Sequence, residues 1–225
     1  TVGYNSAVGS TPKLAGSGLG NQAIGTSSTP INANVQIGNG QGNNVGNAGT
    51  LDLGGLSAFN AYLGTGTFRV GSTVNSGGGT GGAGGSMVIL ATNSTIQATT
   101  ILLASQDSAA QTLSLGSGLN VLNVSSITLA NTGRSSSDLN FNGASGTLTV
   151  RGITGDSTRA DLSLGVNPSF SSGSSVTGTF DTTGHSSDLL FGTMTLGLRG
   201  VSNTGGGTGT INFDTGTLDA NDLKA

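Results

Sequence analysis

The chain has 225 residues, of which 42 are glycine, and only 8% are charged, with ten aspartates, no glutamate, five arginines and two lysines. A collagen is excluded because there is no Gly-X-Y period and there are only three prolines. Disorder is disfavoured because the formal net charge is only -3 and the mean hydropathy is +0.06. The lack of glutamate predicts less than about 10% helix, and no basic stripe suggests nucleic acid as a partner.

Residues 1–49 show little strand pattern, apart from one segment at 35–37, and they contain Pro12 and Pro30. We expect this region to form an irregular cap, an extended arm or a set of first turns of the fold. Residues 50–225 are expected to form a repeat array, interrupted by a protruding loop at 77–85, where the sequence reads GGGTGGAGG.

Short strands of alternating apolar residues recur through this array. One family reads TLDLG (50–54), TFRVG (67–71), TLSLG (112–116), ITLA (127–130), DLSLG (161–165), MTLG (194–197) and DLKA (222–225). A second family reads DLNFNG (138–143), GTFD (178–181) and GTINFD (209–214). The spacing places Ile127, Leu162, Met194 and Leu223 at equivalent positions of one family, and Phe141, Phe180 and Phe213 at equivalent positions of the other.

Strands this short would leave long open edges in a flat sheet. The fold class predicted is therefore all-β, a single-stranded parallel β-helix (β-solenoid), in which each strand pairs with its equivalents above and below. At about 20–25 residues per turn, nine to eleven turns would form a rod of roughly 45–50 Å. Thr, Ser and Asn are expected outside, and one continuous core is expected to contain Leu113, Leu115, Ile127, Leu129, Leu139, Phe141, Leu148, Val150, Leu162, Leu164, Phe180, Met194, Leu196, Ile211 and Phe213.

The segments GTLDLGGLSAFNAYLGTGTFRVG (49–71) and GTGTINFDTGTLDANDLKA (207–225) resemble the autotransporter-associated β-strand repeat proteins, which are secreted surface proteins of bacteria. The resemblance implies a right-handed β-helix, an extracellular or cell-surface location, and a structural or adhesive role. It implies no catalytic residues.

The sequence predicts no catalytic, cofactor-binding or metal site. His185, the only histidine, could act as a base with Asp181 or Asp188, but a polar turn residue is the favoured interpretation. Turn formation is also favoured for the aspartates at 52, 138, 161, 181, 188, 214, 219 and 222, with adventitious Ca²⁺ as the alternative. Because cysteine is absent, there is neither a disulfide nor a thiolate metal site, and no apolar run reaches the ~18 residues that span a membrane.

The first hypothesis for function is a non-enzymatic structural subunit or segment of an extracellular bacterial fibre, matrix or sheath. The alternative is an adhesin passenger that binds a surface or a cell-surface glycan, for which Phe59, Tyr62 and Phe170 are the candidate exposed aromatics. A β-helix polysaccharide hydrolase or lyase is the second alternative. The strand at Leu223 is expected to leave an uncovered turn of the solenoid, which a following segment or another copy, stacked head to tail, would cover.

Overall fold

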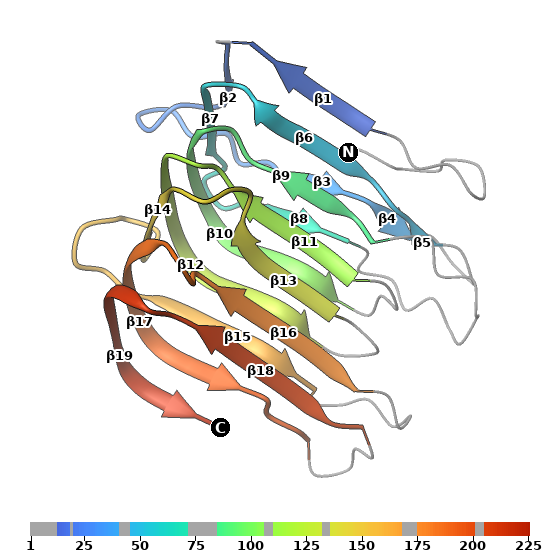
Figure 1. Ribbon diagram of the computed structural model, residues 1–225, viewed down its shortest axis with the longest axis vertical. Coiled ribbons are helices and arrows are strands. Elements are labelled where there is room, and N and C mark those ends of the chain that lie inside the picture. Colours follow the sequence, from blue (N-terminus) through green and yellow to red (C-terminus); the bar gives the residue numbers. More distant parts are fainter. Residues whose placement is uncertain are drawn as a thin grey trace.

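The structure is a computed structural model that describes residues 13–18, 20–40, 46–71, 85–105, 110–131, 136–167, 175–200 and 205–225. These residues form nineteen strands and no helix, and two large sheets run side by side along the length of the molecule (Figure 1). The prediction of an all-β fold with little or no helix is confirmed. Residues 1–12, Phe170 and the predicted glycine loop, except Gly85, lie outside the described residues.

Both large sheets contain only parallel pairs. The first has the order β1 (Lys13–Ser17), β6 (Thr50–Gly55), β9 (Met87–Ile89), β11 (Ala110–Leu115), β13 (Ser136–Phe141), β16 (Val176–Asp181) and β18 (Gly207–Asn212). The second contains β2 (Asn21–Ile24), β3 (Val35–Ile37), β7 (Ala58–Tyr62), β8 (Thr67–Val70), β10 (Asn93–Ser105), β12 (Leu119–Asn131), β14 (Thr147–Arg151), β15 (Ala160–Val166), β17 (Ser186–Leu196) and β19 (Thr215–Lys224). Within the described residues, the only antiparallel pair joins β4 (Asn39–Gly40) and β5 (Gly46–Asn47).

The chain passes repeatedly from a strand of the first sheet to one or two strands of the second sheet and back. We call each such unit a rung; the described residues contain seven, from the first rung (β1, β2 and β3) to the last rung (β18 and β19). The smallest register difference is 25 residues, from Val88 to Leu113, and the largest is 41, from Leu139 to Phe180. The expectation of nine to eleven turns of 20–25 residues was therefore wrong, because long connections between rungs lengthen the repeat.

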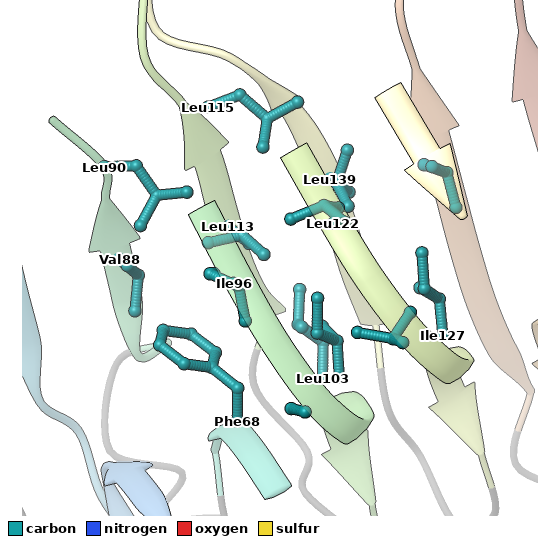
Figure 2. Close-up of a cluster of buried hydrophobic side chains, with 14 of the residues drawn as sticks. Phe68, Val88, Leu90, Ile96, Leu103, Leu113, Leu115, Leu122, Ile127 and Leu139 are labelled. Atoms are coloured by element: carbon teal, nitrogen blue, oxygen red, sulfur yellow. The ribbon is translucent and has the colours of Figure 1, made fainter. Parts of the chain in front are cut away.

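The core lies between the two sheets. It consists of the inward-facing side chains, which occur at every second residue of a strand. Figure 2 shows Val88, Leu113 and Leu139 of the first sheet opposite Ile96 and Leu122 of the second. Of the fifteen predicted core residues, eleven are buried and four are half-buried. The half-buried four are Phe141, Leu196, Ile211 and Phe213, and none is exposed. The single continuous core predicted from the alternation is confirmed.

One inward row of the second sheet contains three buried polar residues, which corrects the expectation that Ser and Asn lie outside. Ser94, Asn120 and Ser187 are all buried, and they share this row with the apolar residues Phe59 and Leu148. The amide of Asn120 accepts a hydrogen bond from the Gly116 backbone N–H (2.9 Å) and donates to the Gly116 carbonyl oxygen (2.8 Å). At a corner between two strands, the backbone N–H and C=O groups lose their partners in the neighbouring strand. The buried amide of Asn120 replaces those partners by hydrogen bonding to the backbone.

Candidate functional site: the last rung

The last rung has a neighbouring strand on one side only. β18 pairs with β16, β19 pairs with β17, and the described part of the chain places no strand beyond them. In Figure 1 these strands form the lower end of the molecule. A parallel strand in the middle of a sheet pairs along both edges, so the outer edges of β18 and β19 present backbone N–H and C=O groups in one row.

The same edge exposes the end of the core. Leu189, Phe191 and Met194 of β17 are buried, with at most 4% of each residue exposed. Their partners one rung later are Leu218 and Ala220, which are half-buried, and Leu223, which is 62% exposed. Leu218, Ala220 and Leu223 continue the apolar rows of Leu189, Phe191 and Met194. Their greater exposure therefore results from their position at the end of the stack.

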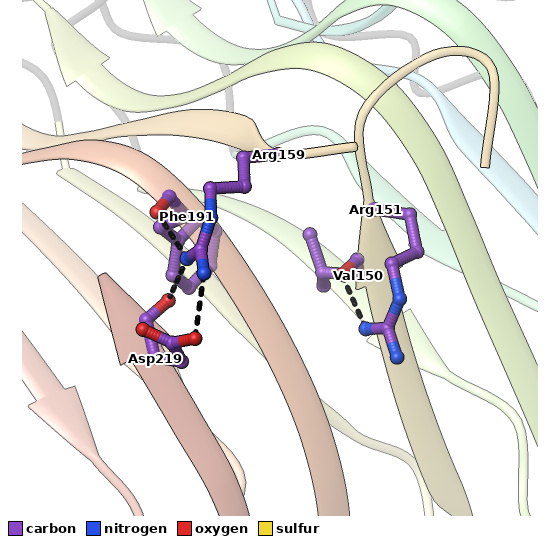
Figure 3. Close-up of polar contacts among 5 residues, drawn as sticks. All are labelled: Val150, Arg151, Arg159, Phe191 and Asp219. Atoms are coloured by element: carbon purple, nitrogen blue, oxygen red, sulfur yellow. Dashed lines mark hydrogen bonds and ion pairs between the residues drawn. The ribbon is translucent and has the colours of Figure 1, made fainter. Parts of the chain in front are cut away.

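Two arginine side chains connect the last two rungs to the preceding rung by hydrogen bonds and ion pairs. Nη1 of Arg159, which precedes β15, donates to the carbonyl oxygens of Phe191 (2.9 Å) and Asp219 (3.1 Å), and Nη2 donates to Asp219 Oδ2 (2.6 Å) (Figure 3). This hydrogen bond, together with the charge of Arg159, lowers the pKa of the Asp219 carboxyl, although partial desolvation opposes the shift. Arg151, at the end of β14, pairs in the same way with Asp188 of β17, one rung before Asp219. The last rung is thus held in place although one edge is open.

The turn between β16 and β17 contains His185. Its Nδ1 lies 2.9 Å from the carbonyl oxygen of Thr183, its Nε2 lies 3.0 Å from that of Gly143, and its ring stacks on Phe141 at 3.8 Å. Both ring nitrogens therefore contact backbone carbonyls, and the side chain bridges two successive rungs. This geometry offers neither nitrogen to a substrate.

The two carboxylates considered as partners of His185 lie in different sheets. Asp188 is in β17 and pairs with Arg151, whereas Asp181 ends β16 and accepts hydrogen bonds from the Thr183 N–H (2.9 Å) and from Asn212 Nδ2 (3.2 Å). Burial raises the pKa of Asp181, but these hydrogen bonds, one from the Thr183 hydroxyl and the charge of His185 outweigh it and lower that pKa overall. Asp181 therefore stays ionised in its turn.

The remaining aspartates considered for metal binding are dispersed over the surface. Asp52 accepts from the Gly54 N–H (3.1 Å), Asp161 from the Thr193 N–H (2.8 Å) and Asp214 from the Gly184 N–H (2.9 Å). Asp138 lies within β13, and Asp222 lies 3.4 Å from Lys224 Nζ. Within the described residues, no group of three or more carboxylates and imidazoles could hold a metal ion.

Of the aromatic residues considered for surface binding, Phe59 and Tyr62 are described, and they lie on opposite faces of β7. Phe59 is buried in the core and packs edge-to-face on Phe68, with 6.4 Å between ring centroids. Tyr62 is half-buried on the opposite face of the same strand. The expectation that Phe59 is exposed is therefore wrong, because Phe59 and Ala61 occupy the inward positions of β7.

Sequence reasoning missed the glycines that bring the two sheets together near the last rung. The inward row Ser137, Gly178, Gly209 runs along three adjacent strands. A Cβ atom on Gly178 would lie 2.6 Å from the carbonyl oxygen of Leu129 in the opposite sheet, and one on Gly209 would lie 2.5 Å from that of Leu164. The repeated Gly-Thr-apolar pattern in GTFD and GTINFD was the available signal.

Because the described residues contain no helix, they contain no apolar helix long enough to cross a membrane. Comparison with known proteins brings no further evidence on family or function: no family model, no curated protein and no solved structure matches this chain.

Proposed function

We propose that the chain is a right-handed parallel β-solenoid and serves as a non-enzymatic structural segment of an extracellular bacterial fibre, matrix or sheath, assembled end to end through the last rung. The observation that carries the proposal is the step in burial between adjacent rungs. Met194 is 4% exposed, and its partner Leu223 in the same row is 62% exposed.

An added rung, with one strand beside β18 and one beside β19, would supply both the backbone pairing and the apolar cover that this edge lacks. It would pair with the backbone groups of β18 and β19, and its inward side chains would cover Ile211, Leu218 and Leu223. Solenoid ends require such a cover to stay soluble, and strand addition at an open sheet edge is a general mode of protein association. A stack that grows in this way has no intrinsic limit to its length.

The extracellular location and the structural role are supported by the sequence. Two segments resemble surface proteins of bacteria whose passenger regions form β-helices. A structural role also agrees with the engagement of both nitrogens of His185 by backbone carbonyls. No specific contact of the described residues favours a glycan-binding adhesin or a polysaccharide-cleaving enzyme.

The experiment compares Leu223→Asp with a matched control, Leu119→Asp. Leu119 is also an exposed leucine of the second sheet, at 53%, but it lies on the outer face of β12, in the middle of the stack. Both substitutions introduce a carboxylate at an exposed site, so we expect both variants to fold.

Light scattering over a range of protein concentrations, with negative-stain microscopy, measures assembly. Full burial of a leucine contributes about 1.5–3 kcal/mol, so losing the exposed part of Leu223 and adding a charge should raise the concentration needed for assembly at least about tenfold. Leu119→Asp should assemble like the unmodified chain. A concentration-independent monomer of the unmodified chain, or equal effects of the two substitutions, would contradict the proposal.

A further inference from the structure

We propose that the partner of the last rung is the first rung of a second copy of this chain, joined head to tail so that Leu218 lies beside Ile24 and Leu223 beside Val35. This inference rests on the proposed end-to-end assembly and specifies which surfaces meet and in which register.

The apolar rows of the second sheet are the first argument. One row runs from Ile24 in β2 through every rung to Leu218, and another runs from Val35 in β3 to Leu223. Ile24 and Val35 are half-buried, and β2 and β3 each have a neighbouring strand on one side only within the described residues. The two ends of the molecule therefore carry apolar side chains at matching positions of parallel strands.

Side-chain size at a third inward position also matches. The row that starts at Gln22 in β2 ends at Gly216 in β19. Gln22 is exposed, and Gly216 has no side chain. In the proposed register the amide of Gln22 lies against a glycine, where no second large side chain competes for space. The long connection between β2 and β3 lies against the second rung, on the side away from the proposed junction, because the Ile31 N–H donates to the Tyr62 carbonyl oxygen and Asn34 accepts from the Thr67 N–H.

The charges of the two ends favour the head-to-tail arrangement over a tail-to-tail contact between two last rungs. Residues 205–225 contain Asp214, Asp219, Asp222 and Lys224, so three negative charges and one positive charge give a net charge of -2, whereas residues 20–40 contain no charged residue. A two-fold axis would make two β19 strands antiparallel. Pairing Leu218 with Ala220 would then set Asp219 opposite Asp219.

The other two antiparallel registers that pair Leu218 with an apolar inward residue of β19 have the same fault, and the registers that set an aspartate of β19 opposite Lys224 leave Leu218 opposite no residue of β19. Pairing Leu218 with Leu223 sets Asp219 opposite Asp222, and pairing Leu218 with itself sets Asp222 opposite Asp214. Like charges directly opposite each other destabilise a strand pair. Against β2 and β3, which contain no charged residue, the same carboxylates meet no charge.

The absence of native cysteine allows a direct test by disulfide cross-linking. Ala23 and Thr217 are exposed and belong to one outward row, so across the proposed junction they become neighbours on adjacent parallel strands. Adjacent strands lie about 4.8 Å apart, which falls within the Cα separation of about 4.4–6.8 Å that a disulfide requires. The variants Ala23→Cys and Thr217→Cys of the 225-residue chain are oxidised separately and as a mixture, and covalent dimers are measured on non-reducing gels.

We expect a covalent dimer only in the mixture, and a ladder of multimers from the chain that carries both substitutions. The off-register control pairs Thr217→Cys with Asn21→Cys, since Asn21 is exposed and lies two residues before Ala23, and this mixture should cross-link at least about tenfold less.

Homodimers of Thr217→Cys, or equal yields from the two mixtures, would overturn the head-to-tail register but leave end-to-end assembly intact. No cross-link between Ala23→Cys and Thr217→Cys, with multimers still present by light scattering, would overturn it in the same way. If no multimer forms at all, both the register and the proposed function are wrong.

Discussion

Replacing Gly178 by alanine tests whether the two sheets are as close as the structure places them. The added methyl group would meet the carbonyl oxygen of Leu129 at 2.6 Å and the backbone nitrogen of Gly165 at 2.7 Å. Both are backbone atoms of ordered strands, so they cannot move aside as the end of a flexible side chain can. Overpacking of this kind costs about 1–3 kcal/mol.

A matched control separates steric crowding from the general effect of removing a glycine. At Gly206 the added methyl group would meet only the Ser175 hydroxyl oxygen, at 3.6 Å. Glycine-to-alanine changes at unstrained positions stabilise by about 0.4–1 kcal/mol, because the unfolded chain loses freedom. Gly206→Ala should therefore be neutral or slightly stabilising.

Thermal unfolding followed by far-UV circular dichroism measures both variants. For a chain of this size, 2 kcal/mol corresponds to a fall in Tm of about 4–8 °C, which we expect for Gly178→Ala. A Tm of Gly178→Ala at or above that of the unmodified chain, or equal to that of Gly206→Ala, would show that the sheets are not in close contact at this glycine.

Two further predictions concern the core and the last rung. Leu148→Asp should lower the free energy of unfolding by several kcal/mol, because it buries an unpaired charge, whereas Thr149→Leu on the outward face of the same strand should change it by less than about 1 kcal/mol; urea unfolding compares them. Arg159 lowers the pKa of Asp219 in the folded chain, so the stabilising effect of this pair is present above the unfolded value of 3.8 and is lost as the pH falls through the folded value. The protection factor of the amides in the last rung, which is the exchange rate of an unfolded amide at the same pH divided by the observed rate, should therefore decrease as the pH falls below about 4. Asp219→Asn should remove this dependence, and an unchanged pH dependence in that variant would refute the role of the pair.

The accuracy of the predicted repeat differed between the two sheets. The spacing set Ile127, Leu162, Met194 and Leu223 in one row, and the structure pairs these four residues in that row. In the first sheet, the spacing aligned Phe180 with Phe141 and Phe213, but Phe180 pairs with Leu139 and Ile211. The shift is two residues, so every side chain stays on its predicted face. Similar residue types in a family of short motifs do not specify register, because adjacent inward positions are chemically alike.

The sequence predicted the inward position of Leu223 but not the extent of its exposure at the candidate site. The sequence indicated that Leu223 belongs to an inward row, since Asp222 and Lys224 on either side of it are polar. Its exposure depends on which strands lie beside β19, and that is decided by pairing between segments far apart in the chain. The contacts of His185 with Gly143 and Phe141, which lie more than 40 residues earlier, depend on the same stacking.

By itself, the sequence determined the strand class, the period of two and the face that the strands of the two repeat families present to the core, because the pleat makes inward and outward positions a local property of the chain. The tertiary structure decided the number of rungs, the burial of Asn120 and the close approach of the sheets at Gly178 and Gly209. Each of these depends on connection lengths that vary from rung to rung, and on backbone groups of another segment that must be paired or given room. Such constraints arise between residues that are distant in the chain, and they become visible only when the strands are stacked.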